Sequence, residues 1–239
     1  MEKVIVMGDD LGEKKVLIEE IEGLALGYQV GEPIFTKEIK QQVNEHFEVA
    51  SNDSFTRTVN EYLRRLEKRG VISKYDDGIY FRSKETKFGR SAIDKEKLVK
   101  KAYIVDEQED EVIGYIAGAA FLNANGFSNN MTNRQEIVTN NYNVKKPIHK
   151  FSNPPIIKKP KVPISKYNYR YFQLLDTLRD IEQYHVLDAS FYVSLYDYME
   201  RERIDGFKLL GYAKKYYNQK VMHILDELAE AVLDRELIG

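Results

Sequence analysis

The sequence predicts an α+β fold in which three helices and a hairpin precede a mixed α/β segment and a helical C-terminal segment. Three observations predict it. Apolar residues recur at helical spacing in the first 70 residues and again after residue 170. Two short apolar runs flank an Asp-Gly turn at Gly78, which indicates a hairpin. Five of the six prolines lie between Pro147 and Pro163, and this spacing excludes a helix there.

The first segment has three apolar stripes at helical spacing. The first helix ends at Gly27, the second begins with Thr36 as N-cap, and the third begins near Asp53 and ends before Gly70, where a C-cap glycine belongs. The stripes are Leu17, Ile18, Ile21, Leu24 and Ala25, then Ile39, Val43 and Phe47, then Phe55, Val59, Tyr62, Leu63 and Leu66. Two strands are predicted at 71–75 and 79–82. The pattern of residues 1–90 therefore predicts a winged helix-turn-helix domain.

We expect residues 91–239 to form a second domain. It should be mixed α/β with a Pro-rich basic segment over 91–165, and helical over 166–239. Residues 98–103 have helical spacing, and the small residues from Gly114 onward favour a close-packed helix that runs to Leu122. An Asn-rich stretch favours turns, and residues 136–139 indicate a strand. Amphipathic patterns then predict four helices at roughly 170–185, 189–203, 206–217 and 219–236.

The net charge of −2, from 36 basic and 38 acidic residues, hides a segregated distribution. The segments 1–55, 56–90, 91–136, 137–175 and 176–239 carry −7, +5, −3, +8 and −5. The two basic segments are therefore where a polyanionic partner is expected to bind.

The third helix has a polar face opposite its apolar stripe. With Phe55 at zero and 100° per residue, the stripe spans about −20° to +80° and the polar residues about 140° to 240°. In a winged helix-turn-helix this face can enter a major groove, where Arg pairs with guanine and Asn with adenine. A merely solvated face is the alternative. The candidate DNA contacts are Ser54, Arg57, Thr58, Asn60, Glu61, Arg64 and Lys68, with Lys74 and Arg82 from the hairpin.

The second basic segment has no acidic residue, and aromatic residues are interleaved with its cations. Two interpretations stay open: a surface that follows phosphates and stacks bases, or a solvated connector whose aromatic residues dock on the helices. Its cations are Lys145, Lys146, Lys150, Lys158, Lys159, Lys161, Lys166 and Arg170.

Several functions lack any signal in the sequence. There is no cysteine, and the four histidines are isolated, so we expect no metal site, no cofactor and no catalytic residue. No apolar run approaches the roughly 20 residues that cross a bilayer, and the N-terminus does not resemble a signal peptide. We expect a cytoplasmic protein that does not contact membranes.

Three stretches resemble the AbiEi family of antitoxins. The first is Leu63-Arg64-Arg65-Leu66-Glu67-Lys68-Arg69-Gly70-Val71-Ile72, followed by Gly78-Ile79-Tyr80-Phe81. The second is the segment from Gly118 to Ser128 with Glu136-Ile137-Val138-Thr139-Asn140, and the third is Ala213 to Val221. This chain has Asn129-Asn130 where the family often has Thr-Gln, and the Pro-rich basic stretch matches poorly.

The resemblance implies a two-part antitoxin of a type IV system. Its winged helix would repress its own operon by binding repeats in double-stranded promoter DNA, as a monomer or as a homo-oligomer. The second domain would neutralise a nucleotidyltransferase-like cognate toxin without needing a stable complex. A ligand-responsive winged-helix repressor is the alternative, and a protein that acts on RNA or as an enzyme through its Asn-rich middle is a third class.

Overall fold

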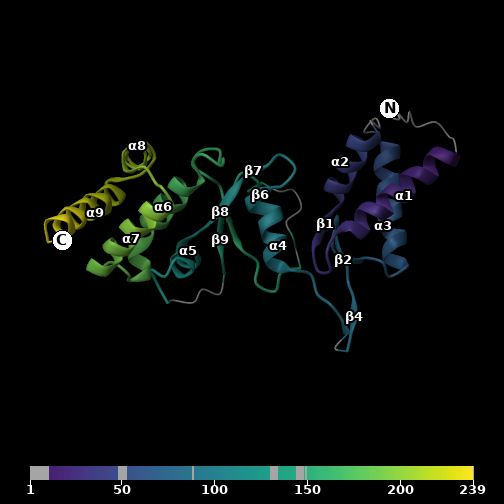
Figure 1. Ribbon diagram of the computed structural model, residues 1–239, viewed down its shortest axis with the longest axis horizontal. Coiled ribbons are helices and arrows are strands. Elements are labelled where there is room, and N and C mark those ends of the chain that lie inside the picture. Colours follow the sequence, from purple (N-terminus) through teal and green to yellow (C-terminus); the bar gives the residue numbers. More distant parts are fainter. Residues whose placement is uncertain are drawn as a thin grey trace. The chain divides into compact units, whose positions relative to one another are not determined.

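The computed structural model describes residues 11–47, 53–87, 89–129, 134–143, 148 and 150–238, and shows a mixed α+β protein (Figure 1). The chain forms two compact units. The first comprises Met1–Lys101 with Ile148–Lys150, and the second comprises Ala102–Pro147 with Phe151–Gly239.

The first unit consists of helices packed on a small sheet. Its elements up to residue 81 are α1 (Leu11–Gly27), β1 (Pro33–Phe35), α2 (Thr36–Phe47), α3 (Asp53–Lys68), β2 (Ser73–Asp76) and β3 (Ile79–Phe81). The apolar stripes predicted for the three helices meet in one core, which includes Ile21, Val43 and Leu63, each fully buried. Each of the three helices has one apolar face, and packing the helices together buries all three faces. Helical spacing of apolar residues therefore predicts these elements.

The sheet of this unit has the order β1-β3-β2 and is antiparallel throughout. Gly78, with φ of +72°, closes the turn between β2 and β3, a conformation that an L side chain rarely adopts. Strand β1 was not predicted: it has only three residues, and Pro33 would argue against a strand unless it lies at an edge, which is where β1 pairs with β3.

A short hairpin and a helical turn complete the first unit. The hairpin joins β4 (Glu85–Thr86) to β5 (Gly89–Arg90), and α4 (Lys95–Val99) runs into a π-helical turn at Lys100–Ile104. The Asp94 side chain accepts from two backbone N–H groups at the start of α4. At the end of the unit, Lys101 lies 3.2 Å from the Glu38 carboxylate, and both side chains are buried.

The second unit begins with a small hairpin and a three-stranded sheet. The hairpin pairs β6 (Val105–Asp106) with β7 (Glu111–Val112). The sheet has the order β10-β9-β8: β8 (Gly114–Ala117) pairs antiparallel with β9 (Glu136–Thr139), which pairs parallel with β10 (Ile156–Lys158). The strand predicted at 136–139 is thus confirmed.

The helix predicted from Gly114 to Leu122 is wrong in its first half, because residues 114–117 form β8 and only α5 (Gly118–Ala124) is helical. A Cβ on Gly114 would lie 2.2 Å from the Tyr103 carbonyl oxygen and 2.7 Å from that of Val138. Glycine at position 114 therefore lets neighbouring backbones approach closely; it does not serve the packing of a helix.

Helices form the remainder of the second unit. They are α6 (Tyr169–Arg179), a 3-10 turn at Ile181–Tyr184, α7 (Ala189–Arg201), α8 (Gly206–Tyr216) and α9 (Gln219–Ile238). Their buried apolar faces form one core with Phe121 and Leu122 of α5. Of the helices in the described part of the chain, none is both long enough and apolar enough to span a bilayer.

Candidate nucleic-acid interface and a polar network

Helix α3 has one fully buried face and one open face. Phe55, Val59, Leu63 and Leu66 are each 0% exposed, and the side chains on the far side of the helix are exposed or half-buried. Gly70 stops the helix with a φ of +76°. The burial of the apolar stripe fixes the rotation of α3, so the polar face is held outward by the core.

The predicted DNA contacts on α3 lie together on its open face. Arg57, Glu61, Arg64 and Lys68 are exposed, and Asn60 is half-buried. No ion pair between Arg57, Arg64 or Lys68 and another described residue occurs within 4.0 Å, whereas the neighbouring cations are engaged by acids. Arg65 pairs with Glu61.

Near the start of α3, the Thr58 hydroxyl donates to the Ser54 carbonyl oxygen at 3.0 Å. This hydroxyl keeps its acceptor capacity, but its proton is already used within the helix. At the other end, Arg69 donates to both Glu22 carboxylate oxygens at 3.1 and 2.9 Å, which ties α3 to α1 and lowers the pKa of Glu22. Arg69 is therefore a packing residue.

The two candidate DNA contacts of the hairpin already have partners within the first unit. Lys74 pairs with Asp77 at 3.0 Å, and the hydrogen bond raises the pKa of Lys74. Arg82 donates to the carbonyl oxygens of Leu26 and Tyr28 at 2.6 and 2.8 Å, so its guanidinium satisfies backbone acceptors at the C-terminal end of α1. A phosphate contact by Arg82 stays a prediction, and its structural role is the one visible in the contacts.

The described cations of the second basic segment are divided between the two units. Lys145 and Lys146 lie outside the described residues, and Lys150 belongs to the first unit, where its backbone contacts Tyr75 and Asp76. The other five cations lie in the second unit.

Acidic residues distant in sequence neutralise three of those five cations. Lys158 lies 2.6 Å from Glu136, Lys166 lies 3.8 and 3.9 Å from Glu111 and Asp110, and Arg170 lies 3.3 Å from Glu202. Lys159 and Lys161 lie instead over the rings of Tyr142 and Tyr217, at 5.3 and 4.7 Å from the centroids. Folding thus places carboxylates beside three of these five cations, and the other two lie over tyrosine rings.

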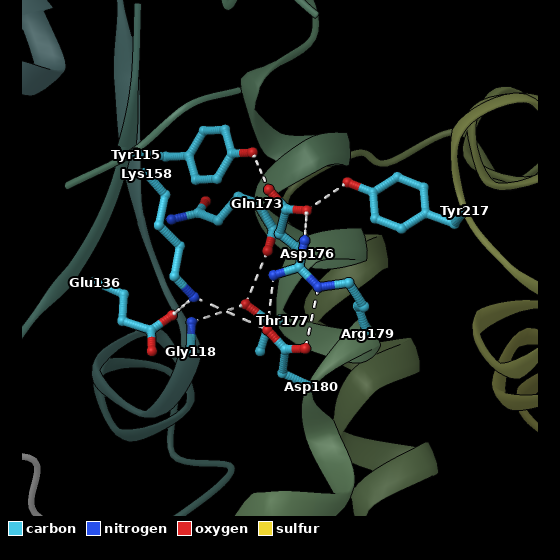
Figure 2. Close-up of polar contacts among 10 residues, drawn as sticks. All are labelled: Tyr115, Gly118, Glu136, Lys158, Gln173, Asp176, Thr177, Arg179, Asp180 and Tyr217. Carbon is cyan, nitrogen blue, oxygen red and sulfur yellow. Dashed lines mark hydrogen bonds and ion pairs between the residues drawn. The ribbon is translucent and has the colours of Figure 1, made fainter. Parts of the chain in front are cut away.

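Lys158 joins a polar network centred on α6, which the sequence analysis missed (Figure 2). The Asp176 carboxylate is 5% exposed and accepts from the Tyr115 hydroxyl at 2.7 Å, the Tyr217 hydroxyl at 2.8 Å and Arg179 at 3.0 Å. Burial, together with the Asp176 charge, raises the pKa values of Tyr115 and Tyr217, so both hydroxyls remain protonated donors.

Arg179, which also lies on α6, extends the network from Asp176 to Asp180. Arg179 donates to both Asp180 oxygens, at 3.0 and 2.6 Å, and this pairing lowers the pKa of Asp180. Lys158 of β10 lies 4.0 Å from Asp180 and 2.6 Å from Glu136 of β9.

The backbone contributes as well. The Thr177 hydroxyl accepts from the Gly118 N–H at 3.2 Å and donates to the Gln173 carbonyl oxygen at 2.8 Å. Gln173 donates to the Ile116 carbonyl oxygen at 2.8 Å. The network therefore fastens the sheet and the start of α5 to α6.

One sequence signal could have revealed this network. Asp176 follows Phe172 by four residues, so it lies on the same buried stripe of α6, and a carboxylate in such a stripe requires partners. Those partners come from residues 115 and 217, too far away in the sequence for spacing to indicate them.

Two grooves adjoin α6 in the second unit. One of about 430 Å³ is lined by Lys166, Tyr167, Tyr171 and Arg203, and one of about 320 Å³ by Phe121, Asn125, Gln135 and Tyr198. Both grooves are also lined by Tyr169, Arg170 and Glu202. The Arg170–Glu202 pair therefore stands between them and limits free charge in either.

No protein-family model and no curated protein matches this chain. The resemblance to the AbiEi family accordingly rests on the quoted stretches alone.

Proposed function

We propose that the first unit binds double-stranded DNA through the open face of α3 and that the protein represses transcription of its own operon. The observation that carries this proposal is the set of exposed cations Arg57, Arg64 and Lys68 on one face of α3, held outward by a fully buried stripe. These cations make no ion pair within the described residues, so no carboxylate need be displaced before they bind DNA.

The spacing along α3 supports insertion into one major groove. Arg57 and Arg64 are separated by seven residues, about 10.5 Å along the helix and at nearly the same angle around it. Asn60 lies between them on the same face. Arg and Asn make the bidentate contacts that distinguish guanine and adenine. Three helices packed on a small antiparallel sheet are also the composition of a winged helix-turn-helix, and this likeness supports the proposal that α3 is the recognition helix.

The test is binding to the DNA upstream of the protein's own gene, measured by fluorescence anisotropy at fixed salt. Arg64→Ala should weaken binding by about 1–3 kcal/mol and relax the preference for one base pair. Lys68→Gln should weaken binding similarly on all sequences and reduce the salt slope by about 1.

Arg201→Ala is the matched control, because it removes an exposed arginine from α7 in the second unit. It should leave the affinity for the upstream DNA unchanged. Wild-type affinity of Arg64→Ala at matched salt would refute the assignment of α3.

We further propose, on the resemblance, that the protein is an antitoxin that neutralises a nucleotidyltransferase-like toxin. Co-expression with the product of the adjacent gene tests this: growth should be rescued by the wild-type protein and by Arg64→Ala, since the second unit would carry this activity. Absence of rescue would eliminate the antitoxin function and leave DNA binding untouched.

The grooves beside Arg170 favour a second candidate, a repressor that responds to a small ligand. In that case a metabolite would change the affinity for the upstream DNA, and substitution of Tyr169 by Ala would abolish the change without altering binding in its absence. A neighbouring nucleotidyltransferase-like gene favours the antitoxin instead.

A further inference from the structure

Helix α8 carries positive charge without any acidic residue. It contains Lys208, Lys214 and Lys215, and the next acid along the chain after Asp205 is Asp226. Its apolar residues Leu209 and Ala213 are buried against the rest of the second unit. The charge therefore lies on the outer part of a helix whose other side is fixed by the core.

Three lysines of this region are held over tyrosine rings. Lys208 lies 4.8 Å from the Tyr171 centroid, Lys215 lies 5.1 Å from that of Tyr216, and Lys161 lies 4.7 Å from that of Tyr217. None of the three forms an ion pair with another described residue. A ring face fixes the ammonium group without using its N–H donors, and Lys208 donates only one of its three to the Tyr167 carbonyl oxygen, so donors remain for an anion and less side-chain entropy is lost on binding.

Two aromatic side chains near the start of α8 are mostly exposed to solvent. Phe207 is 91% exposed and Tyr167 is 72% exposed. Phe207 precedes Lys208 in the chain, and Lys208 also lies 3.5 Å from the Tyr167 carbonyl oxygen. Both rings therefore lie at the same end of the basic face. An exposed ring beside unpaired cations is the combination that single-stranded nucleic acids bind.

We propose that this aromatic–basic face, formed by Lys161, Tyr167, Phe207, Lys208 and Lys215, binds a single-stranded polynucleotide. Tyr167 and Phe207 stack on bases, Lys208 and Lys215 contact phosphates along about 10 Å of α8, and Lys161, over Tyr217, contacts a phosphate beyond the end of α8. A duplex does not fit, because its bases are already stacked on one another. Since rings and phosphates are common to RNA and DNA, the face binds both.

A membrane surface fits these residues less well. Interfacial helices bury a broad apolar face in the lipid, whereas the apolar residues of α8 other than Phe207 are buried or half-buried in the protein. These residues belong to the second unit and α3 to the first, so the test does not depend on the proposed binding of duplex DNA.

The test uses the full chain and labelled oligo-uridine and oligo-thymidine, with affinity measured by fluorescence anisotropy over a range of salt. Both oligonucleotides should bind with similar affinity. Phe207→Ala should weaken binding at least fivefold, as expected for loss of one stacking contact. The triple variant Lys161→Gln, Lys208→Gln and Lys215→Gln should reduce the slope of log K against log salt by about 2.

Matched controls separate the face from general effects. Leu233→Ala removes an apolar side chain of α9 that is 59% exposed, and Lys84→Gln with Lys97→Gln and Lys100→Gln removes three cations from the first unit. Both controls, and Arg64→Ala, should bind the oligonucleotides as the wild type does. Circular dichroism melts confirm that each variant is folded.

The proposal is overturned if the folded wild-type chain leaves the oligonucleotide anisotropy unchanged, if Phe207→Ala binds as tightly as wild type, or if the control triple variant loses as much affinity as the α8 triple variant. Binding to phosphatidylserine vesicles without binding to oligonucleotides would identify a membrane surface and overturn it as well.

Discussion

Individual charged residues in this protein differ chiefly in whether folding gives them a partner. Lys101 and Glu38 have side chains only 7% and 10% exposed and lie 3.2 Å apart. Burial raises the pKa of Glu38, and the charge of Lys101 opposes this rise. The pair therefore depends on both members, since a buried carboxylate without its cation is strongly destabilising.

Lys101→Met should lower the free energy of unfolding by about 3–5 kcal/mol at pH 7, measured by urea denaturation. Without Lys101, the folded-state pKa of Glu38 rises further above its unfolded value. A raised carboxyl pKa contributes stability at low pH that is lost as the pH rises through the folded-state pKa. The deficit of the variant should therefore shrink as the pH is lowered toward the unfolded pKa of Glu38.

Addition of Glu38→Gln to Lys101→Met should recover much of the loss, because the unpaired carboxylate is removed. Lys100→Met, at an exposed neighbouring position, is the control and should stay within about 0.5 kcal/mol of wild type. A double variant no more stable than Lys101→Met would contradict this account.

Asp180 responds to pH in the opposite direction. Its hydrogen bonds with Arg179 lower its pKa below the ordinary value of 3.8. A lowered carboxyl pKa contributes stability that is present above the unfolded value and lost as the pH falls through the folded-state value. Asp180→Asn should therefore unfold at a lower temperature than wild type at pH 7, and the difference should diminish below about pH 4, followed by circular dichroism. A difference independent of pH would refute the role of the charge.

At the level of elements, strand β8 shows how one glycine determines a local structure. The position of a Cβ on Gly114 is already occupied by the backbone carbonyl oxygens of Tyr103 and Val138. Neither backbone can move without disturbing the β8–β9 pairing.

Gly114→Ala should therefore destabilise the protein by about 3 kcal/mol or more, measured by urea denaturation. Gly211→Ala is the matched control within the same unit, since nothing lies within 4 Å of the added Cβ in α8. It should stabilise the protein by about 0.5–1 kcal/mol, because alanine is the better helix former. Equal effects of the two substitutions would show that space at Gly114 is not limiting.

The elements that sequence periodicity predicted are those with a continuous apolar stripe. Helices α1 to α3 and α7 to α9 follow the predicted ranges closely, because a stripe at 3.6-residue spacing has few alternatives to burial as a helix. The helix predicted at 170–185 is shorter than expected: α6 ends at Arg179, and a 3-10 turn at Ile181–Tyr184 follows. Strands β1 and β4 to β8 were missed, since two to four residues are too few to establish a period of two; β2 and β3, which are equally short, were found because the Asp-Gly turn marks their hairpin. In β8 the small residues, which also suit close helix packing, misled the prediction.

The candidate interface also has a part that the sequence predicts and a part that it does not. The open face of α3 follows from its own periodicity, so Arg57, Asn60 and Arg64 could be placed together from the sequence. The engagement of Arg82 with α1 and of Lys158 with Glu136 could not, because these contacts join residues more than 20 positions apart. Charge patterns along a chain indicate where cations are, but only the fold determines which of them acquire a carboxylate.

At the scale of the whole molecule, the net charge of −2 is a sum over the sequence, and the fold treats the two basic segments differently. Around α3, Arg57, Arg64 and Lys68 remain open to solvent. In the segment around 158–170, acids from β7, β9 and the α6–α8 region neutralise Lys158, Lys166 and Arg170. A net charge close to zero is therefore compatible with a localised polyanion site, and weak long-range attraction should keep non-specific binding low.

The division of the chain between its units has a consequence for synthesis on the ribosome. Ile148–Lys150 belongs to the first unit, where the Tyr75 hydroxyl donates to the Lys150 carbonyl oxygen at 2.8 Å and the Lys150 N–H donates to Asp76. The chain emerges from its N-terminus, so the helices of the first unit can fold early. Their hairpin, however, acquires these last contacts only after the first 46 residues of the second unit have been translated. Completion of the first unit thus waits for the emergence of Lys150.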